Sequence, residues 1–126
     1  MPTAERLKAY VAMVNEGRYA DAIREFYHED AAMHENQKPP RVGRDALVAN
    51  EERAMQRVAI RTVKLEAFPA GDLVAVHSVF EFVDKEGRVS GLDEMSIQRW
   101  KGDRIAEEHF FYDPAQLRKP GEAAPG

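Results

Sequence analysis

The second half of the sequence consists of four β-rich runs separated by three short turn signals, and this order constrains the fold more than any other feature. The runs cover residues 58–68, 73–83, 89–100 and 104–112. The signals between them are typical of tight turns: Pro69-Ala70-Gly71-Asp72, Asp84-Lys85-Glu86-Gly87 and Lys101-Gly102-Asp103. Because turns this short connect neighbouring antiparallel strands, the pattern predicts a meandering antiparallel sheet.

The first half has a helical period instead. Apolar residues recur with the i, i+3, i+4, i+7 spacing of an amphipathic helix: Leu7, Tyr10, Val11 and Val14. Thr3 can cap the start of this helix and Gly17 can close its end. Shorter helices are predicted around residues 22–27 and over 44–56, with a short strand over 31–35. Helices that precede a sheet indicate an α+β fold in which they pack on one sheet face.

Composition limits the class of protein. The 126 residues include 44% hydrophobic and 32% charged side chains, which is typical of a soluble globular chain. The sequence contains no cysteine, which excludes disulfides and thiolate metal sites and agrees with a cytoplasmic location. No secretory signal and no apolar run of about 20 residues is seen, so we expect no membrane association. The net charge of −4, without a dense basic cluster, argues against nucleic-acid binding.

The strand at 73–83 is apolar on both faces. One face carries Val74, Val76, Ser78, Phe80 and Phe82. The other carries Leu73, Ala75, His77, Val79, Glu81 and Val83. A sheet with one face in water usually alternates polar and apolar residues. We therefore expect helices on one face and a second copy of the chain on the other, giving a homodimer. A strongly twisted, partly exposed strand is the alternative.

Residues 9–36, AYVAMVNEGRYADAIREFYHEDAAMHEN, carry a family resemblance. The features are an Asn-x-Gly helix end, a Phe-Tyr pair, an acidic pair and a strand that ends in a carboxylate. They resemble the opening of the nuclear-transport-factor-2-like superfamily, closest to its SnoaL-like polyketide cyclases and ketosteroid isomerases. The later strands also agree, so we interpret residues 1–114 as a single SnoaL-like domain. Residues 115–126 would form a short turn and a flexible tail.

The resemblance implies a curved sheet wrapped around the N-terminal helix as a cone, the cystatin-like or ketosteroid-isomerase-like roll. The cone would hold a small hydrophobic molecule in an apolar pocket. The resemblance makes Glu35 the candidate catalytic base and Tyr10 the donor to a developing oxyanion. An alignment counted back from Gly43 places His34 in the position of Glu35 instead. Tyr10 also lies on the apolar stripe of its helix, so plain core packing is the other interpretation.

A second oxyanion donor is expected on a later strand, where the resemblance places an aspartate but this chain has Ser96. Glu94 shares the face of Ser96 and is the third candidate catalytic residue. The resemblance turns Glu94, Ser96, Gln98 and Trp100 inward. The alternation alone equally allows this face to meet solvent, with Met95 and Ile97 buried.

The same parity turns Glu108, Phe110 and Tyr112 inward on the last strand. If Glu35, Glu94 and Glu108 shared one cavity, their repulsion would keep at least one protonated near neutral pH. Such a cavity would also suit a cationic or amine-bearing ligand. Alternatively, one or two of these acids would pair with Arg or Lys at the rim.

The remaining pocket candidates complete a set of predicted ligand-binding residues: His34, Asn36, Ser78, Phe80, Phe82, Ser96, Gln98, Trp100, Glu108, Phe110 and Tyr112. Asn36 could orient Glu35, and Arg41 could attract an anionic group. The run Glu51-Glu52-Arg53 is interpreted as a solvated helix face. The four histidines do not converge in the predicted strands, so no metal site is expected.

Two classes of function remain open. The first is a cofactor-independent acid–base enzyme, an isomerase, cyclase or dehydratase, acting on a small hydrophobic carbonyl compound. The absence of a phosphate loop or zinc motif agrees with chemistry that needs no cofactor. The second is a non-catalytic ligand-binding or dimerisation module with the same fold. A cavity lined by two or more carboxylates would favour the enzyme.

Overall fold

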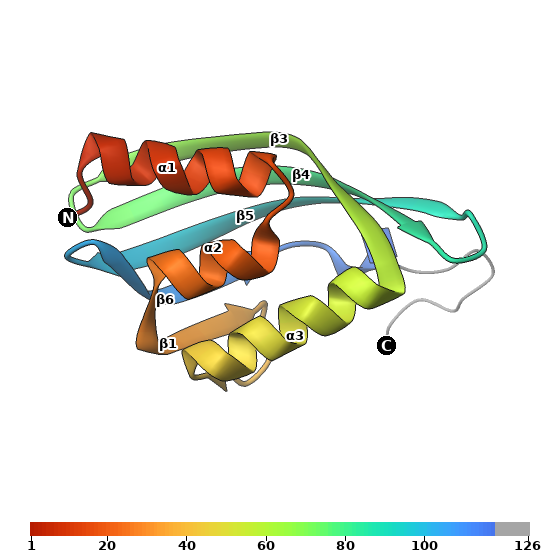
Figure 1. Ribbon diagram of the computed structural model, residues 1–126, viewed down its shortest axis with the longest axis horizontal. Helices are drawn as coiled ribbons and strands as arrows, with labels where there is room; N and C mark the ends of the chain where they lie inside the picture. Colours follow the sequence, from red (N-terminus) through yellow and green to blue (C-terminus); the bar gives the residue numbers. More distant parts are fainter. Residues whose placement is uncertain (118–126) are drawn as a thin grey trace.

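The computed structural model describes residues 1–117 and has the predicted α+β architecture (Figure 1). Its three helices are α1 (Ala4–Asn15), α2 (Tyr19–Phe26) and α3 (Arg44–Arg57). The strands are β1 (Tyr27–Glu35), β2 (Arg41–Val42), β3 (Val58–Ala70), β4 (Leu73–Asp84), β5 (Val89–Lys101) and β6 (Arg104–Phe111). A short 3-10 helix, η1 (Pro114–Leu117), follows the last strand. All three helices lie on one face of the sheet.

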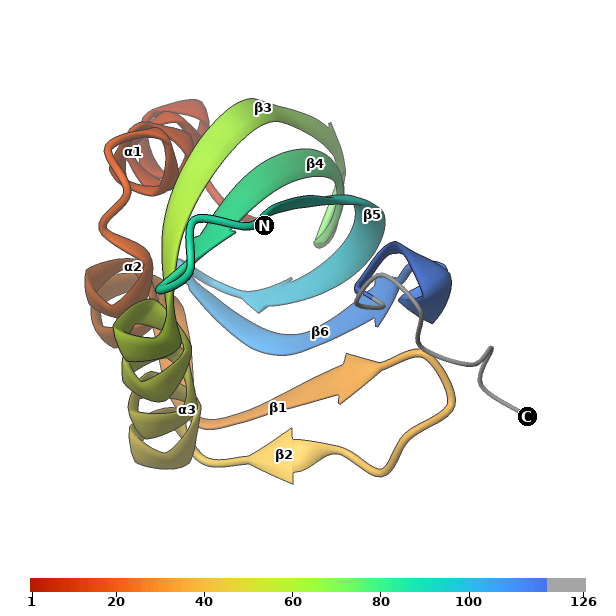
Figure 2. The ribbon, with the colours of Figure 1, turned by 90° about the vertical axis from the view of Figure 1, so that its right-hand side faces the viewer.

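The six strands form one curved, unclosed sheet in the order β2-β1-β6-β5-β4-β3. Strands β3 to β6 make the predicted antiparallel meander. The predicted antiparallel meander does not extend to β1, which pairs parallel to β6, and β2 was not predicted. Bulges at Thr62/Lys64 and Arg99/Trp100 increase the local bend, and Figure 2 shows the curvature of the sheet.

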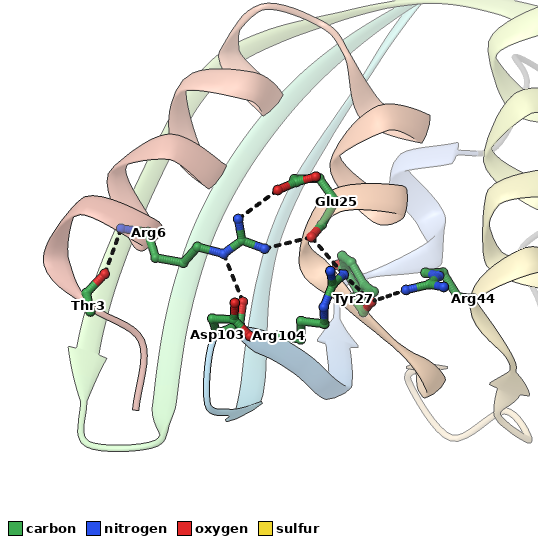
Figure 3. A network of polar contacts seen from close by, with 7 residues as sticks. All are labelled: Thr3, Arg6, Glu25, Tyr27, Arg44, Asp103 and Arg104. Carbon is green, nitrogen blue, oxygen red and sulfur yellow. Dashed lines mark hydrogen bonds and ion pairs between the residues drawn. The ribbon is translucent and has the colours of Figure 1, made fainter.

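The chain turns from α2 into β1 at Tyr27, one residue earlier than the predicted helix end. Three arginine side chains hold this corner (Figure 3). Arg6 and Arg104 donate to the carbonyl oxygen of Glu25 at 2.7 and 3.0 Å, and Arg44 donates to that of Tyr27 at 3.2 Å. The last carbonyls of a helix have no intrahelical partner and carry partial negative charge. The guanidinium groups therefore stabilise the end of α2 and fix where β1 begins.

The narrow end of the cone is filled by the protein's own side chains. Leu7, Tyr10 and Val14 of α1 are buried, as the helical spacing predicts. The Tyr10 ring makes edge contacts with the rings of Phe26 and Trp100, at centroid distances of 5.5 and 6.3 Å. This packing closes one end of the cone and leaves only the wide end available for a ligand.

The first part of the predicted C-terminal tail is ordered against the sheet. The side-chain amide of Gln116 in η1 exchanges two hydrogen bonds with the backbone of Asp93, at 2.7 and 3.0 Å. The rest of the predicted tail, residues 118–126, lies outside the described residues. Within residues 1–117, no helix combines the length and the apolar character needed to cross a membrane.

Candidate functional site

A cavity of about 1190 Å³ occupies the wide end of the cone, between α3 and the concave face of the sheet. Aromatic and aliphatic side chains form much of its wall: Tyr19, Met33, Ile60, Phe80, Phe82, Leu92, Phe110 and Leu117. Charged side chains also line it: Glu35, Lys38, Arg41, Glu51, Arg57, Asp84, Arg88 and Glu94. A cavity of this size and composition can hold a small apolar molecule and present it to a few polar groups.

The inward face of β5 is the one that the family resemblance indicates. Glu94, Ser96, Gln98 and Trp100 are buried. Met95 and Ile97, on the opposite face, are each 40% exposed. The strand therefore buries a mostly polar face and exposes the apolar side chains of Met95 and Ile97, which is the reverse of what hydrophobicity alone favours.

Glu94 is the inward carboxyl of β5 that reaches the cavity. Its residue is only 8% exposed, and its carboxyl group makes no hydrogen bond within residues 1–117. Among the described residues, every side-chain oxygen that is fully buried has a hydrogen-bond partner. The Glu94 carboxyl oxygens have no partner, so they must open onto the cavity. Burial, and then the charges of Glu108, Glu35 and Glu51, raise the pKa of Glu94 to about 8. This carboxyl is therefore mostly protonated at neutral pH and can donate a hydrogen bond or a proton.

Glu35, and not His34, faces the cavity. The parallel register places Glu35 beside the inward Phe110 and His34 beside the outward His109. The hydroxyl of Tyr112 donates to a carboxylate oxygen of Glu35 at 3.2 Å, at the exposed mouth of the cavity. Burial and the adjacent Glu35 raise the pKa of Tyr112 to about 12, so the phenol remains a donor. The predicted ligand contact of His34 is therefore wrong, since its ring stacks on His109 on the outer face.

Glu51 is a cavity residue that the sequence interpretation missed. It lies on α3 and lines the cavity, together with Asn50 and Ala54 of the same helix. Burial, followed by the charges of Glu108 and Glu35, raises its pKa. The expectation of a solvated Glu51-Glu52-Arg53 face holds only for Glu52 and Arg53, which are exposed.

Glu108 is completely buried beneath the cavity floor and does not line the cavity. Its carboxyl group accepts hydrogen bonds from the hydroxyls of Tyr27 and Ser96 and from the side-chain amide of Gln98, the last two at 2.7 and 3.1 Å. Burial raises the pKa of Glu108, and these three donors oppose the rise. Because every polar group here has a partner, the cluster acts as a satisfied core network.

Tyr10 belongs to this network and does not reach the cavity. Its hydroxyl oxygen accepts a hydrogen bond from the Gln98 amide at 3.1 Å, and burial raises its pKa far above the ordinary value. The Trp100 indole donates to the Gln98 carbonyl at 3.0 Å. Tyr10, Ser96, Gln98 and Trp100 were predicted to meet a ligand or substrate. They meet one another instead, because the narrow end of the cone is closed.

Some of the remaining predicted residues line the cavity, and others only support the strands around it. Phe80, Phe82 and Phe110 line the cavity as expected. Ser78 is buried but does not line it. Asn36 does not line the cavity. It has a positive φ of 52°, and its side chain accepts a hydrogen bond from the backbone N–H of Tyr112 at 3.0 Å. Asn36 therefore joins the end of β1 to the end of β6 and does not orient Glu35 directly.

No three His, Asp or Glu side chains of residues 1–117 are arranged to hold a metal ion. The carboxyl groups that line the cavity include the mostly protonated Glu94 in the wall, Glu51 on α3 and Glu35 at the mouth. This set can remove a proton from one atom of a small molecule and donate to another.

Comparison with known protein families identifies the family of this chain. A family model described as a SnoaL-like domain matches residues 7–108. The chain belongs to the SnoaL-like family. A search among curated proteins finds no significant relative of this SnoaL-like chain.

Solved structures share the SnoaL-like fold at low sequence identity. A protein of Mesorhizobium loti described as a SnoaL-like polyketide cyclase is 23% identical, with a TM-score of 0.73 over 89% of this chain and 100% of that one. A polyketide cyclase-like protein of Xanthomonas campestris is 20% identical, with a TM-score of 0.76 over 90% and 95%. A Catenulispora acidiphila protein with a ketosteroid isomerase-like fold, in complex with trimethylamine, is 19% identical, with a TM-score of 0.75 over 98% and 99%. These likenesses establish the fold of this SnoaL-like chain.

Proposed function

We propose that this chain binds a small, apolar, carbonyl-bearing molecule in the cavity and moves a proton on it without a cofactor. The observation that carries the proposal is the Glu94 carboxyl, which is buried, open to the cavity and free of protein partners. A group kept neutral by burial in an apolar wall costs stability unless a ligand uses it. Family membership supports a reaction of cyclase or isomerase type.

The proposed step is an enolisation. The Glu35 carboxylate removes a proton from the carbon next to the ligand carbonyl, and the electron pair of that C–H bond moves toward the carbonyl oxygen. The protonated Glu94 donates to that oxygen and stabilises the developing charge. Return of a proton to the same or another carbon, or attack of the enolate carbon on a second carbonyl, completes an isomerisation or a cyclisation. Tyr112 holds the Glu35 carboxylate toward the cavity.

The test is proton exchange on a ketone probe. β-Tetralone, a bicyclic ketone with acidic α protons, is incubated with the protein in heavy water and the loss of α-proton signal is followed by NMR. We expect exchange well above the buffer rate, a loss of at least about 100-fold in Glu35→Gln, and a comparable loss in Glu94→Ala. Glu29→Gln is the matched control, since Glu29 is exposed on β1 and does not line the cavity. Exchange at the buffer rate in the unmodified protein would overturn the proposal.

A non-catalytic binding module is the second candidate. The cavity volume and the aromatic walls favour binding whether or not chemistry follows. Saturable binding of β-tetralone, measured by calorimetry, together with exchange at the buffer rate would favour this candidate over the enzyme.

We also propose that two copies pair through the outer face of the sheet. The strand registers align one row of outward side chains across five strands: Phe68, Ala75, Ile97, His109 and His34. The next row brings Met95 beside Phe111, and both are at least 40% exposed. Arg99 and Glu107, of opposite charge, lie opposite one another on this face, so the row carries no net charge that would repel a second copy.

The oligomeric state tests this pairing. We expect light scattering to give a dimer mass for the unmodified protein and a monomer mass for Ile97→Lys. Met55→Lys is the control, because Met55 is equally exposed but lies on α3. A monomer mass for the unmodified protein at micromolar concentration would contradict the proposal.

A further inference from the structure

Three cationic side chains of the cavity have no partner. Lys38, Arg41 and Arg57 line the cavity, and none of them forms an ion pair or a side-chain hydrogen bond with another of residues 1–117. All three are exposed, which places them at the mouth. Lys38 lies in the connection after β1, Arg41 begins β2, and Arg57 ends α3, so two separate parts of the fold contribute to this mouth.

Their charge is not balanced within the cavity. Arg88 and Asp84 lie 2.9 Å apart and neutralise one another. Glu51 and Glu94 lie deeper, and burial raises the pKa of both carboxyls, which favours their neutral forms. Glu35 is then the lining carboxyl at the mouth that opposes Lys38, Arg41 and Arg57 among the described residues. The cavity is therefore cationic at its mouth, although the chain as a whole carries a net charge of −4.

The cavity therefore has a charged region at its mouth and an apolar region behind it. Unpaired guanidinium groups bind carboxylates through two parallel hydrogen bonds, and they keep their charge at every physiological pH. The rings of Phe80, Phe82 and Phe110 supply the apolar wall beyond the mouth. A ligand that satisfies both regions has an apolar body and one anionic end.

We infer that the cavity selects an apolar carboxylic acid over the corresponding alcohol or amine, with the carboxylate of the ligand bound by one of the unpaired arginines of the mouth, Arg41 or Arg57. The inference rests on the proposed function, since it names the ligand class of the same cavity. It also decides between the ligand charges that the sequence left open. The three acidic side chains suggested an amine, whereas the depth of two of them and the free cations at the mouth favour an anion.

The test uses three probes with one apolar body: naphthylacetic acid, naphthylethanol and naphthylethylamine. Calorimetry in low-salt buffer at neutral pH measures each dissociation constant. We expect the acid to bind about tenfold more tightly than the alcohol, and the amine to bind more weakly than the alcohol. At least one of Arg41→Gln and Arg57→Gln should remove most of the preference for the acid, by weakening the binding of the acid more than that of the alcohol. Arg53→Gln is the matched control, since Arg53 is exposed on α3 and does not line the cavity.

Equal binding of the acid and the alcohol, a preference for the amine, no binding of any probe, or an unchanged preference in both arginine variants would each overturn the inference. The proposed chemistry is judged separately, by the exchange of β-tetralone. A protein that prefers the acid but does not accelerate that exchange would refute the proton transfer and leave the ligand class standing. A protein that accelerates exchange but binds all three probes alike would do the opposite.

Discussion

Replacing Glu94 by glutamine should stabilise the protein, and the gain should depend on pH. In the folded chain the pKa of Glu94 is raised from 4.5 to about 8, first by burial and then by the neighbouring carboxyl groups. In the unfolded chain the same carboxyl loses its proton near the ordinary value. Between these two pH values the folded state binds the extra proton, so the free energy of unfolding falls as the pH rises.

The size of the effect follows from the shift. Each pH unit between the two pKa values removes about 1.4 kcal/mol from the free energy of unfolding. At pH 7 the loss is on the order of 3 kcal/mol, and it levels off near 5 kcal/mol above pH 8. Glutamine has nearly the same shape and does not titrate. The stability gained by Glu94→Gln should therefore be small at pH 4, where both forms are neutral, and should increase up to pH 8.

Urea unfolding followed by tryptophan fluorescence measures this gain. Trp100 is the single tryptophan of the chain and is 2% exposed, so its emission reports loss of the core around the site. Unfolding free energies of the unmodified protein, Glu94→Gln and the control Glu29→Gln are compared at several pH values from 4 to 8. Taking the difference between proteins cancels the titration of all other groups. A difference that stays constant with pH, or a Glu94→Gln protein that is less stable at pH 8, would refute the reasoning.

Four further substitutions test other parts of the structure. Glu108→Ala leaves the donors of Tyr27, Ser96 and Gln98 without their acceptor. Urea unfolding should therefore show a free energy of unfolding that is lower by about 3 kcal/mol. A decrease below about 1 kcal/mol would contradict the network. Tyr10→Phe removes a hydroxyl that does not reach the cavity, so β-tetralone exchange should stay within about twofold, and a tenfold fall would return Tyr10 to the reaction. Arg6→Ala removes bonds to Glu25 and Asp103 and the contact with the Phe26 ring, so thermal unfolding should show a loss of about 2 kcal/mol. Arg18→Ala, at a half-exposed ion pair, should change stability by less than about 1 kcal/mol.

The sequence predicted the elements well where a single local rule governs them. The apolar spacing of Leu7, Tyr10 and Val14 placed α1, and the three turn signals placed the meander from β3 to β6. The parallel pairing of β1 with β6 was not predictable from such rules, because it joins strands that are about 70 residues apart and depends on how the sheet curls.

Which face of β5 is buried was predicted from the family resemblance and not from a local rule. Alternation on β5 gave two equivalent choices, and the hydrophobic choice would have buried Met95 and Ile97 and exposed Glu94. The family resemblance indicated the opposite face, which the structure buries. Hydrophobicity fails here because the inward Ser96, Gln98 and Trp100 have hydrogen-bond partners in the core and Glu94 opens onto the cavity.

The sequence could not predict how far each inward side chain lies from the mouth of the cone. Tyr10 and Glu35 both face the interior, but Tyr10 lies in the closed end and Glu35 lies at the mouth. Glu51 is flanked by Glu52 and Arg53, a composition typical of a solvated helix, and only the width of the cone beneath α3 makes it a cavity residue. Which side chains meet a ligand therefore depends on where the packing of the core ends.

The protonation of Glu94 is the central claim, and a carbon NMR titration of isotope-labelled glutamate carboxyls measures it most directly. The signal is assigned by its disappearance in Glu94→Gln. We expect a carboxyl resonance that titrates near pH 8, is missing from that variant and is unchanged in Glu29→Gln. A Glu94 resonance that titrates near pH 4.5 would mean that this carboxyl is an ordinary solvated anion, and it would contradict the proposed cavity chemistry.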